Sequence, residues 1–152
     1  MFHLKFTVDK GSIRRLKRAP AQMRRALIPA MTECMALAER TAKKDYLSGP
    51  GPRKLQRRSG RLRGSITPRV SLSGDRVRGE LGTNVIYGRI HELGGVIRPK
   101  TAKYLKFQID GQWRSVKQVI MPARPFLRPA FEDNLNRFRD IFQRRLIEAF
   151  GK

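Results

Sequence analysis

The segment ITPRVSLSGDRVRGEL, residues 66–81, decides the fold class of this chain. Its apolar residues stand mostly two positions apart on both sides of Ser73-Gly74-Asp75, a sequence typical of a turn. Side chains of a strand alternate between the two faces of a sheet. The spacing therefore predicts a β-hairpin closed by a glycine-containing turn.

Further strands are expected on both sides of this hairpin. Residues 2–8 alternate in the same way and predict a short strand at the start of the chain. Residues 105–109 and 113–120 flank Asp110-Gly111, a dipeptide favoured in two-residue hairpin turns, and predict a second hairpin. Residues 84–95, between the two hairpins, are interpreted as an irregular segment.

Two helical regions are expected, one before and one after the strands. Apolar residues at helical spacing predict a bent helix from about Ser12 to Leu47, which Pro29 should kink or divide. The last helix is expected to carry one apolar face. That face consists of Phe131, Leu135, Phe138, Phe142, Leu146 and Ala149 or Phe150.

These elements predict an α+β fold: an antiparallel sheet of about four strands, packed by a long kinked N-terminal helix and a C-terminal helix. The length of 152 residues favours one domain over 1–152. A run of Gly and Pro at residues 49–52 ends the first helix and opens a flexible basic loop at about 48–64.

The charge of the chain is extreme, because 34 Lys and Arg face only 12 Asp and Glu, a net charge of +22. A positive charge of this size attracts polyanions or acidic protein surfaces. The basic loop is the best candidate contact for DNA or a partner, with Arg53, Lys54, Arg57, Arg58, Arg61 and Arg63. The alternative is a solvated charge run. The loop has no aromatic residue to stack on bases, and no helix-turn-helix or zinc-finger pattern adds sequence specificity.

The sequence offers little for catalysis. His91-Glu92 invites a zinc-protease interpretation, but that motif needs a second His at the position of Gly95. No nucleophile elbow, phosphate loop or dinucleotide fingerprint is present. We therefore expect no enzyme activity, no metal and no cofactor. A hydrolase that depends on His91 is kept as a minor alternative.

Two further expectations concern the environment of the chain. Cys34, the one cysteine, falls on the apolar stripe of the first helix and should be a buried thiol. Trp113 follows a turn and should be partly exposed. Tryptophan is a residue type common at interaction hot spots, so an interface role is plausible. No apolar run is long enough for a membrane span, and residues 1–5 do not resemble a secretory signal, so we expect the protein to be soluble and cytoplasmic when it is made.

Several short stretches form an ordered pattern along most of the chain. It runs through residues 59–66 (SGRLRGSI), 87–95 (YGRIHELGG), 98–100 (RPK), 104–107 (YLKF) and 122–131 (PARPFLRPAF). Over roughly residues 10–150 this pattern resembles the tail-completion and head–tail joining family of tailed bacteriophages and prophages. The virion-morphogenesis proteins of Mu-like phages share parts of it.

The resemblance implies an α+β structural protein that forms a ring, hexameric in the family, at the neck of the virion. Its partners would be tail-tube and head-connector proteins, with DNA in the channel and no membrane. It implies no catalytic residues. The motif residues would instead be structural: Tyr87, His91, Glu92, Gly94 and Gly95 at a turn between sheet segments, and Arg124, Pro125 and Phe126 before the last helix. The main alternative function is a non-specific nucleic-acid-binding module that uses the basic loop.

Overall fold

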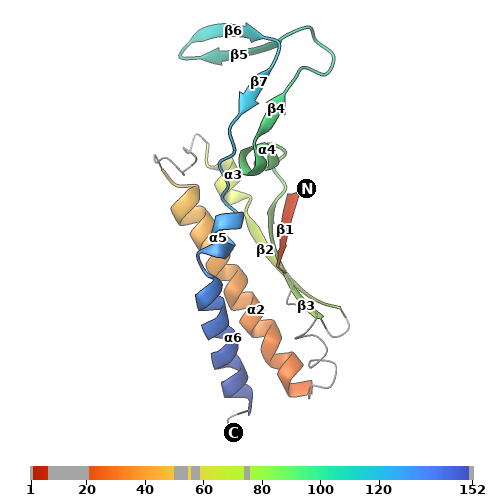
Figure 1. Cartoon of the computed structure of the whole chain (residues 1–152), viewed down its shortest axis with the longest axis vertical. Helices are drawn as coiled ribbons and strands as arrows, with labels where there is room; N and C mark the ends of the chain where they lie inside the picture. The colour runs from red at the N-terminus through yellow and green to blue at the C-terminus, as the bar shows by residue number, and fades with distance from the viewer. Residues whose placement is uncertain (1, 7–20, 50–54, 56–58, 74–75, 151–152) are drawn as a thin grey trace.

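The computed structural model describes residues 2–6, 21–49, 55, 59–73 and 76–150. Its helices are α2 (Ala21–Thr41), the π-helical turn η1 (Ala42–Tyr46), α3 (Arg61–Gly64), α4 (Gly88–Leu93), α5 (Arg128–Glu132) and α6 (Leu135–Phe150). Its strands are β1 (Phe2–Phe6), β2 (Thr67–Ser73), β3 (Arg76–Thr83), β4 (Gly95–Ile97), β5 (Leu105–Ile109), β6 (Gln112–Val116) and β7 (Val119–Met121). The helices and β1–β3 form a body, from which β4–β7 project as a narrow extension (Figure 1).

The body contains a three-stranded antiparallel sheet in the order β1-β3-β2. β2 and β3 pair from Thr67 opposite Gly82 to Ser73 opposite Arg76, which confirms the predicted first hairpin. β1 pairs along the other edge of β3, which confirms the strand expected at the start of the chain. The turn at residues 74–75 lies outside the described residues.

The helix α2 lies directly against β2 and β3, and α6 packs alongside α2 (Figure 1). The approach of α2 to the sheet is close because β3 carries Gly79 at the contact. A Cβ on Gly79 would lie 2.6 Å from the sulfur of Met31 and 2.7 Å from that of Met35. A larger residue at this position would therefore displace the side chains of Met31 and Met35 or the helix that carries them.

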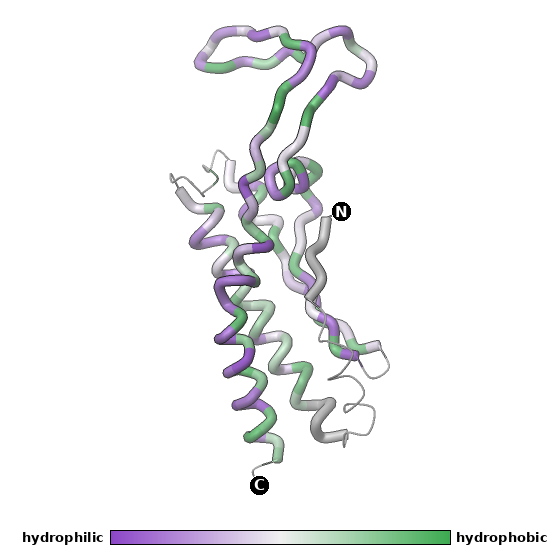
Figure 2. The backbone as a smooth tube through the Cα atoms, viewed as in Figure 1, coloured by the Kyte–Doolittle hydropathy of each residue, from purple (hydrophilic) through white to green (hydrophobic). Residues whose placement is uncertain are grey.

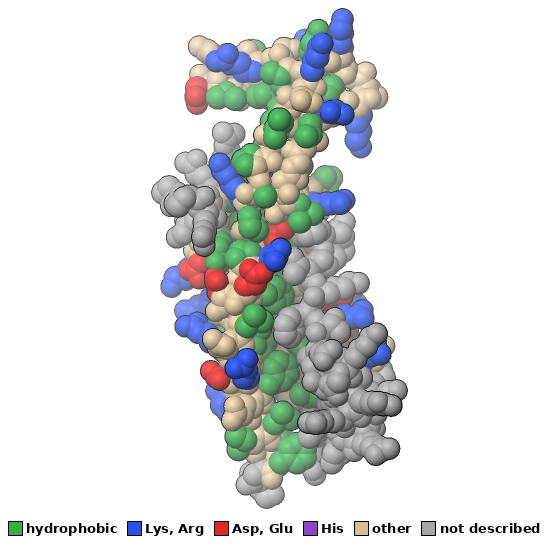
Figure 3. Space-filling model, viewed as in Figure 1, with side chains coloured by type: hydrophobic (Ala, Val, Ile, Leu, Met, Phe, Trp, Pro, Cys, Tyr) green, Lys and Arg blue, Asp and Glu red, His purple; other side chains and the backbone are tan. Residues whose placement is uncertain are grey.

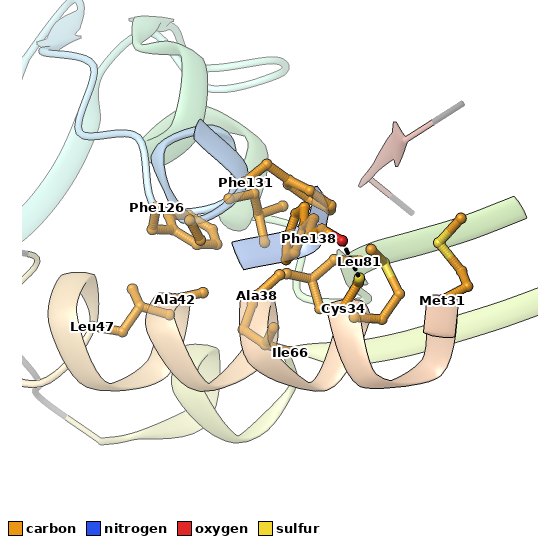
Figure 4. Close-up of a cluster of buried hydrophobic side chains, with 13 residues drawn as sticks. Met31, Cys34, Ala38, Ala42, Leu47, Ile66, Leu81, Phe126, Phe131 and Phe138 are labelled. Carbon is orange, nitrogen blue, oxygen red and sulfur yellow. Dashed lines mark hydrogen bonds between the residues drawn. The ribbon is translucent and has the colours of Figure 1, made fainter. Parts of the chain in front are cut away.

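The core lies where α2, the sheet and the last two helices meet (Figure 4). Met31, Cys34 and Ala38 line the buried face of α2, opposite Leu81 of β3 and Phe138 of α6. Each fully buried large side chain stabilises the fold by about 1.5–3 kcal/mol. The thiol of Cys34 donates a long hydrogen bond to the carbonyl of Phe138 at 4.0 Å, so the prediction of a buried cysteine is confirmed.

Ion pairs reinforce the contact between α2 and α6. Arg145 donates to Glu33 at 3.0 Å, and Arg144 forms a second ion pair with the same carboxylate. The hydrogen bond from Arg144 is the main cause that lowers the pKa of Glu33 below its ordinary value.

The extension, here called the arm (residues 95–121), corrects the predicted sheet. The second hairpin exists, as β5 paired with β6, and its Asp110-Gly111 turn has positive φ at both residues (50° and 79°), as a type I′ turn requires. It does not join the sheet of the body. It forms a two-stranded ladder of its own. Nearer the body, β4 pairs with β7 in another two-stranded ladder. One sheet of about four strands is therefore wrong, while the α+β class holds.

The structure bears on two helical predictions. Of the two effects expected of Pro29, a kink or a division, the division does not occur, because α2 runs through this exposed proline. The last helix is divided at Asn134, whose buried side-chain amide donates to Thr41 and to the carbonyl of Ala130, both at 2.9 Å. Leu135, the first residue after the division, is 48% exposed and does not share the buried face of Phe138.

Residues 84–95 and the basic loop complete the comparison. The first segment is not irregular throughout, because it contains α4. The predicted start of the first helix, before residue 21, and most of the basic loop lie outside the described residues. At the end of the loop, Arg61–Gly64 form the short helix α3.

Candidate binding pocket at the base of the arm

Three separate stretches of sequence meet where the arm leaves the body. They are residues 59–63 around α3, residues 87–95 of α4 and its end, and residues 121–126 after β7. The centre of this junction is Glu92, a carboxylate only 3% exposed. Two features, the bonds of Glu92 and a pocket beside His91, describe the site.

Glu92 links α4 to the start of α5. One of its oxygens accepts the backbone N–H groups of Phe126 and Leu127 at 2.8 and 2.9 Å, and the other accepts that of Arg128 at 2.9 Å. These N–H groups precede and begin a helix, so they have no partner within it. Both oxygens of this buried carboxylate are therefore engaged in holding the backbone at the start of α5.

The two glycines after α4 turn the chain into the arm. Gly94 has φ 69° and ψ −175°, a conformation that residues with a side chain rarely adopt. A Cβ on Gly94 would also lie 2.8 Å from the backbone nitrogen of Ala123. Gly95 has φ 144°, and its Cβ would meet Ile90 at 2.9 Å. Close contact of the chain with Met121 and Ala123 at the base of the arm thus depends on glycine at position 94, while Gly95 leaves room for the side chain of Ile90 in α4.

His91 lies beside Glu92 and faces the other side of the junction. Its ring contacts Tyr87 edge-on, with centroids 5.9 Å apart, and its carbonyl accepts the backbone N–H of Arg124 at 2.7 Å. Its buried Nδ1 has no hydrogen-bond partner among the described residues. Burial, followed by the positive charge of Arg124, lowers the pKa of His91, so the imidazole is neutral at physiological pH.

A pocket of about 540 Å³ opens next to His91. Its charged side chains are all cationic, namely Arg61, Arg63 and Arg124, and the neutral imidazole of His91 also lines it. Its apolar lining consists of Leu47, Leu55, Leu62, Tyr87 and Met121. Ser59 and Gly60 complete the described lining, which includes no carboxylate.

The structure separates the predicted site residues into groups. Arg61 is exposed and Arg63 half-buried, both at the pocket, whereas Arg53, Lys54, Arg57 and Arg58 lie outside the described residues. Tyr87, His91 and Arg124 line the pocket, while Glu92, Gly94 and Phe126 hold its walls. Pro125 is exposed beside Phe126 and lines a neighbouring hollow.

Sequence reasoning missed the apolar wall of the pocket. Leu47 and Met121 come from the end of η1 and from β7, 74 positions apart by their numbers. Each was interpretable only as part of a helix or strand. No short-range signal relates them, since the pocket is created by the return of the chain from the arm.

Other kinds of site have no support in the described part of the chain. No group of three or more His, Cys, Asp or Glu side chains there could hold a metal ion. None of the helices in the described ranges is long and apolar enough to cross a membrane.

Residues 33–146 match the profile of the phage virion morphogenesis family. No curated protein and no solved structure shows significant similarity to the chain. The matched range begins within α2, ends within α6 and includes the whole arm and the pocket.

Proposed function

This chain belongs to the phage virion morphogenesis family, and we propose that it forms a ring that completes the tail or joins it to the head at the virion neck. Membership of the family assigns a structural role in phage assembly. A location at the neck, a ring of copies (a hexamer by family resemblance) and contacts with tail-tube and head-connector proteins are the proposed refinements.

The observation that supports this proposal is the arm, which has no interior of its own. Not one residue from Gly95 to Pro125 is buried. A pair of two-stranded ladders is at best marginally stable in water without a packing partner. An arm of this length therefore gains its stability from a surface outside the described chain, as expected of an assembly subunit.

The chemistry of the arm fits a protein interface. Val96 and Ile120 are directly opposite each other in the β4–β7 ladder and are 50% and 71% exposed. Trp113, near the tip, is 73% exposed, which agrees with the expectation of partial exposure. Figure 2 shows hydrophobic positions along the arm, far from the core. No other strand of the described residues pairs with the outer edges of the two ladders, and such edges can accept a neighbouring strand.

The assembly role is tested in a phage that carries an in-frame deletion of this chain. We expect full heads and finished tails to accumulate separately in lysates, and electron microscopy to show few joined particles. Supplying the chain from a plasmid should restore joining. Normal, joined virions in the deletion strain would overturn the neck assignment.

The ring is tested with the purified protein by sedimentation velocity and negative-stain microscopy over a range of concentrations, alone and with its tail-tube and connector proteins. Val96→Ser with Ile120→Ser should weaken assembly about tenfold or more, as expected when an apolar anchor is lost from an interface. Leu72→Ser, which changes a 52% exposed leucine of β2, is the matched control. A strict monomer that binds neither partner would refute the ring.

A second candidate function, non-specific DNA binding, is favoured by the net charge of +22. Figure 3 shows basic side chains over the arm and the body. Affinity should fall steeply with salt for any protein this basic. The discriminating result is a selective loss of DNA affinity in Arg61→Gln with Arg63→Gln relative to Arg137→Gln with Arg139→Gln, two exposed arginines of α6.

A further inference from the structure

The pocket at the base of the arm concentrates positive charge without an internal counter-charge. Three arginines of the described helices form ion pairs: Arg128 with Glu132, and Arg144 and Arg145 with Glu33. Arg61, Arg63 and Arg124 make no ion pair with any described residue. The nearest carboxylate along the chain from His91, that of Glu92, is occupied by three backbone N–H groups.

The pocket is also more than a charged surface. Leu47, which is 3% exposed, Leu62 and Met121 give it an apolar wall. Its volume of about 540 Å³ falls within the range of about 300–1,000 Å³ that is usual for ligand sites. The imidazole of His91 also lines the pocket. A ligand that fits must combine an apolar group with at least one negative charge.

From this combination we infer that the pocket binds an acidic peptide segment, one that carries an Asp or Glu next to an apolar side chain, on a neighbouring virion protein. The inference rests on the proposed assembly function, because it names the chemistry of a partner in that assembly. The carboxylate pairs with Arg61 and Arg124, and the apolar side chain packs against Leu62 and Met121. Arginine is well suited to this contact because its planar donors match a carboxylate in two places.

Two other occupants fit less well. A second copy of this chain would bring a net charge of +22 toward a basic pocket. Duplex DNA presents its phosphates on a convex surface, where exposed Lys and Arg contact them. It would leave the apolar wall of a pocket of this size unused. An acidic peptide uses both the charge and the apolar wall.

The test begins with selection of random dodecapeptides on the full-length protein, followed by synthesis of an enriched peptide and of its Glu→Gln or Asp→Asn counterpart. Affinities are measured by fluorescence anisotropy at physiological ionic strength. We expect enriched peptides to combine an acidic with an apolar residue. The amide counterpart and the variant Arg61→Gln with Arg124→Gln should each bind roughly tenfold or more weakly, because each loses charge-assisted hydrogen bonds. Arg137→Gln with Arg139→Gln, the control on α6, should bind as the unmodified protein does.

A second measurement reads the pocket directly. The chain has 2 histidines, His3 and His91, so the variant His3→Gln leaves a single imidazole for NMR. Titration with the enriched peptide should move the His91 signals and raise the pKa of its imidazole, because a carboxylate beside it favours the charged form. This readout remains available if the double arginine variant does not fold.

Several outcomes would overturn the inference. The first is enrichment of peptides that carry no acidic residue, and the second is an equal loss of peptide affinity in the α6 control pair. The third is peptide binding that leaves the His91 signals in place. The fourth is displacement of the peptide by unlabelled chain or by short duplex DNA, with the same dependence on Arg61 and Arg124. Failure of the assembly role is a separate result. Normal virions without this chain would refute the neck function even if the peptide binds, and joined particles with no peptide binding would refute only the pocket.

Discussion

The carboxylate of Glu92 accepts the backbone N–H of Phe126 at 2.8 Å, which joins α4 to the chain that returns from the arm 34 positions later. The same carboxylate holds Leu127 and Arg128. Since the acceptor is charged and buried, this contact is among the strongest single links between the arm and the body.

Removal of this carboxylate should destabilise the protein strongly. Glu92→Ala leaves three N–H groups without a partner, and we expect the free energy of unfolding to fall by about 2–5 kcal/mol. Glu92→Gln keeps one oxygen acceptor, so its free energy of unfolding should lie between that of the wild type and that of Glu92→Ala. Urea unfolding followed by circular dichroism measures the difference. Glu132→Gln, at an exposed ion pair, is the control and should change little. Equal stability of Glu92→Ala and Glu132→Gln would contradict this role.

Gly94 should tolerate no side chain. Gly94→Ala places a methyl group 2.8 Å from the backbone nitrogen of Ala123 in a conformation that already disfavours alanine. We expect a loss of about 1–3 kcal/mol from the backbone conformation, with the collision added to it. Gly64→Ala is a matched control, since nothing lies within 4 Å of the new methyl group and α3 favours alanine. Thermal unfolding of both variants checks the prediction, which fails if the two melt together.

The elements of this fold were largely predictable because local patterns determine them. The hairpins around residues 74–75 and around Asp110-Gly111 follow from alternation and turn chemistry. Their separation into a body sheet and an arm does not, since it depends on two glycines and one glutamate that hold the base of the arm. In sequence, Glu92 was part of a family motif, and nothing local indicated that its bonds reach Phe126.

The errors have the same origin. Leu135 has the correct spacing for the buried face of the last helix, yet the bonds of Asn134 to Thr41 and Ala130 break the helix before it. A buried amide that bonds to another helix cannot be recognised from helical periodicity. The pocket is a further case, because its cationic residues belong to predicted motifs whereas its apolar wall is formed only by tertiary contacts.

Cys34 should be unreactive in the folded protein. Burial raises the pKa of its thiol to about 12, with a smaller contribution from the negative charge of Glu33. Thiolate, the reactive form, is therefore scarce at pH 8, and the sulfur is shielded from solvent. Reaction with a maleimide followed by mass spectrometry should be slow in native buffer and complete in denaturant. Comparable rates in both conditions would show that α2 and α6 separate readily in solution.

Because of His91, the free energy of unfolding should decrease as the pH falls below about 6.5. Its pKa in the folded protein is lowered, so the unfolded chain, with a pKa of about 6.5, takes up a proton first. The stability that the neutral imidazole contributes is present above that pH and is lost as the pH falls toward the folded pKa. The positive charge of Arg124 acts in the same direction as burial, since it also lowers the pKa of His91.

Urea unfolding of the wild type and of His91→Gln between pH 5 and pH 7.5 measures this contribution, with His3→Gln as the control for the other histidine. We expect His91→Gln to flatten the pH dependence and His3→Gln to retain it. The carboxylate of Glu33, whose pKa is lowered, contributes stability that is lost only below about pH 4.5, so the two groups titrate in separate windows. An unchanged slope in His91→Gln would mean that the folded imidazole accepts a proton as readily as the unfolded one, which is incompatible with a desolvated ring beside Arg124.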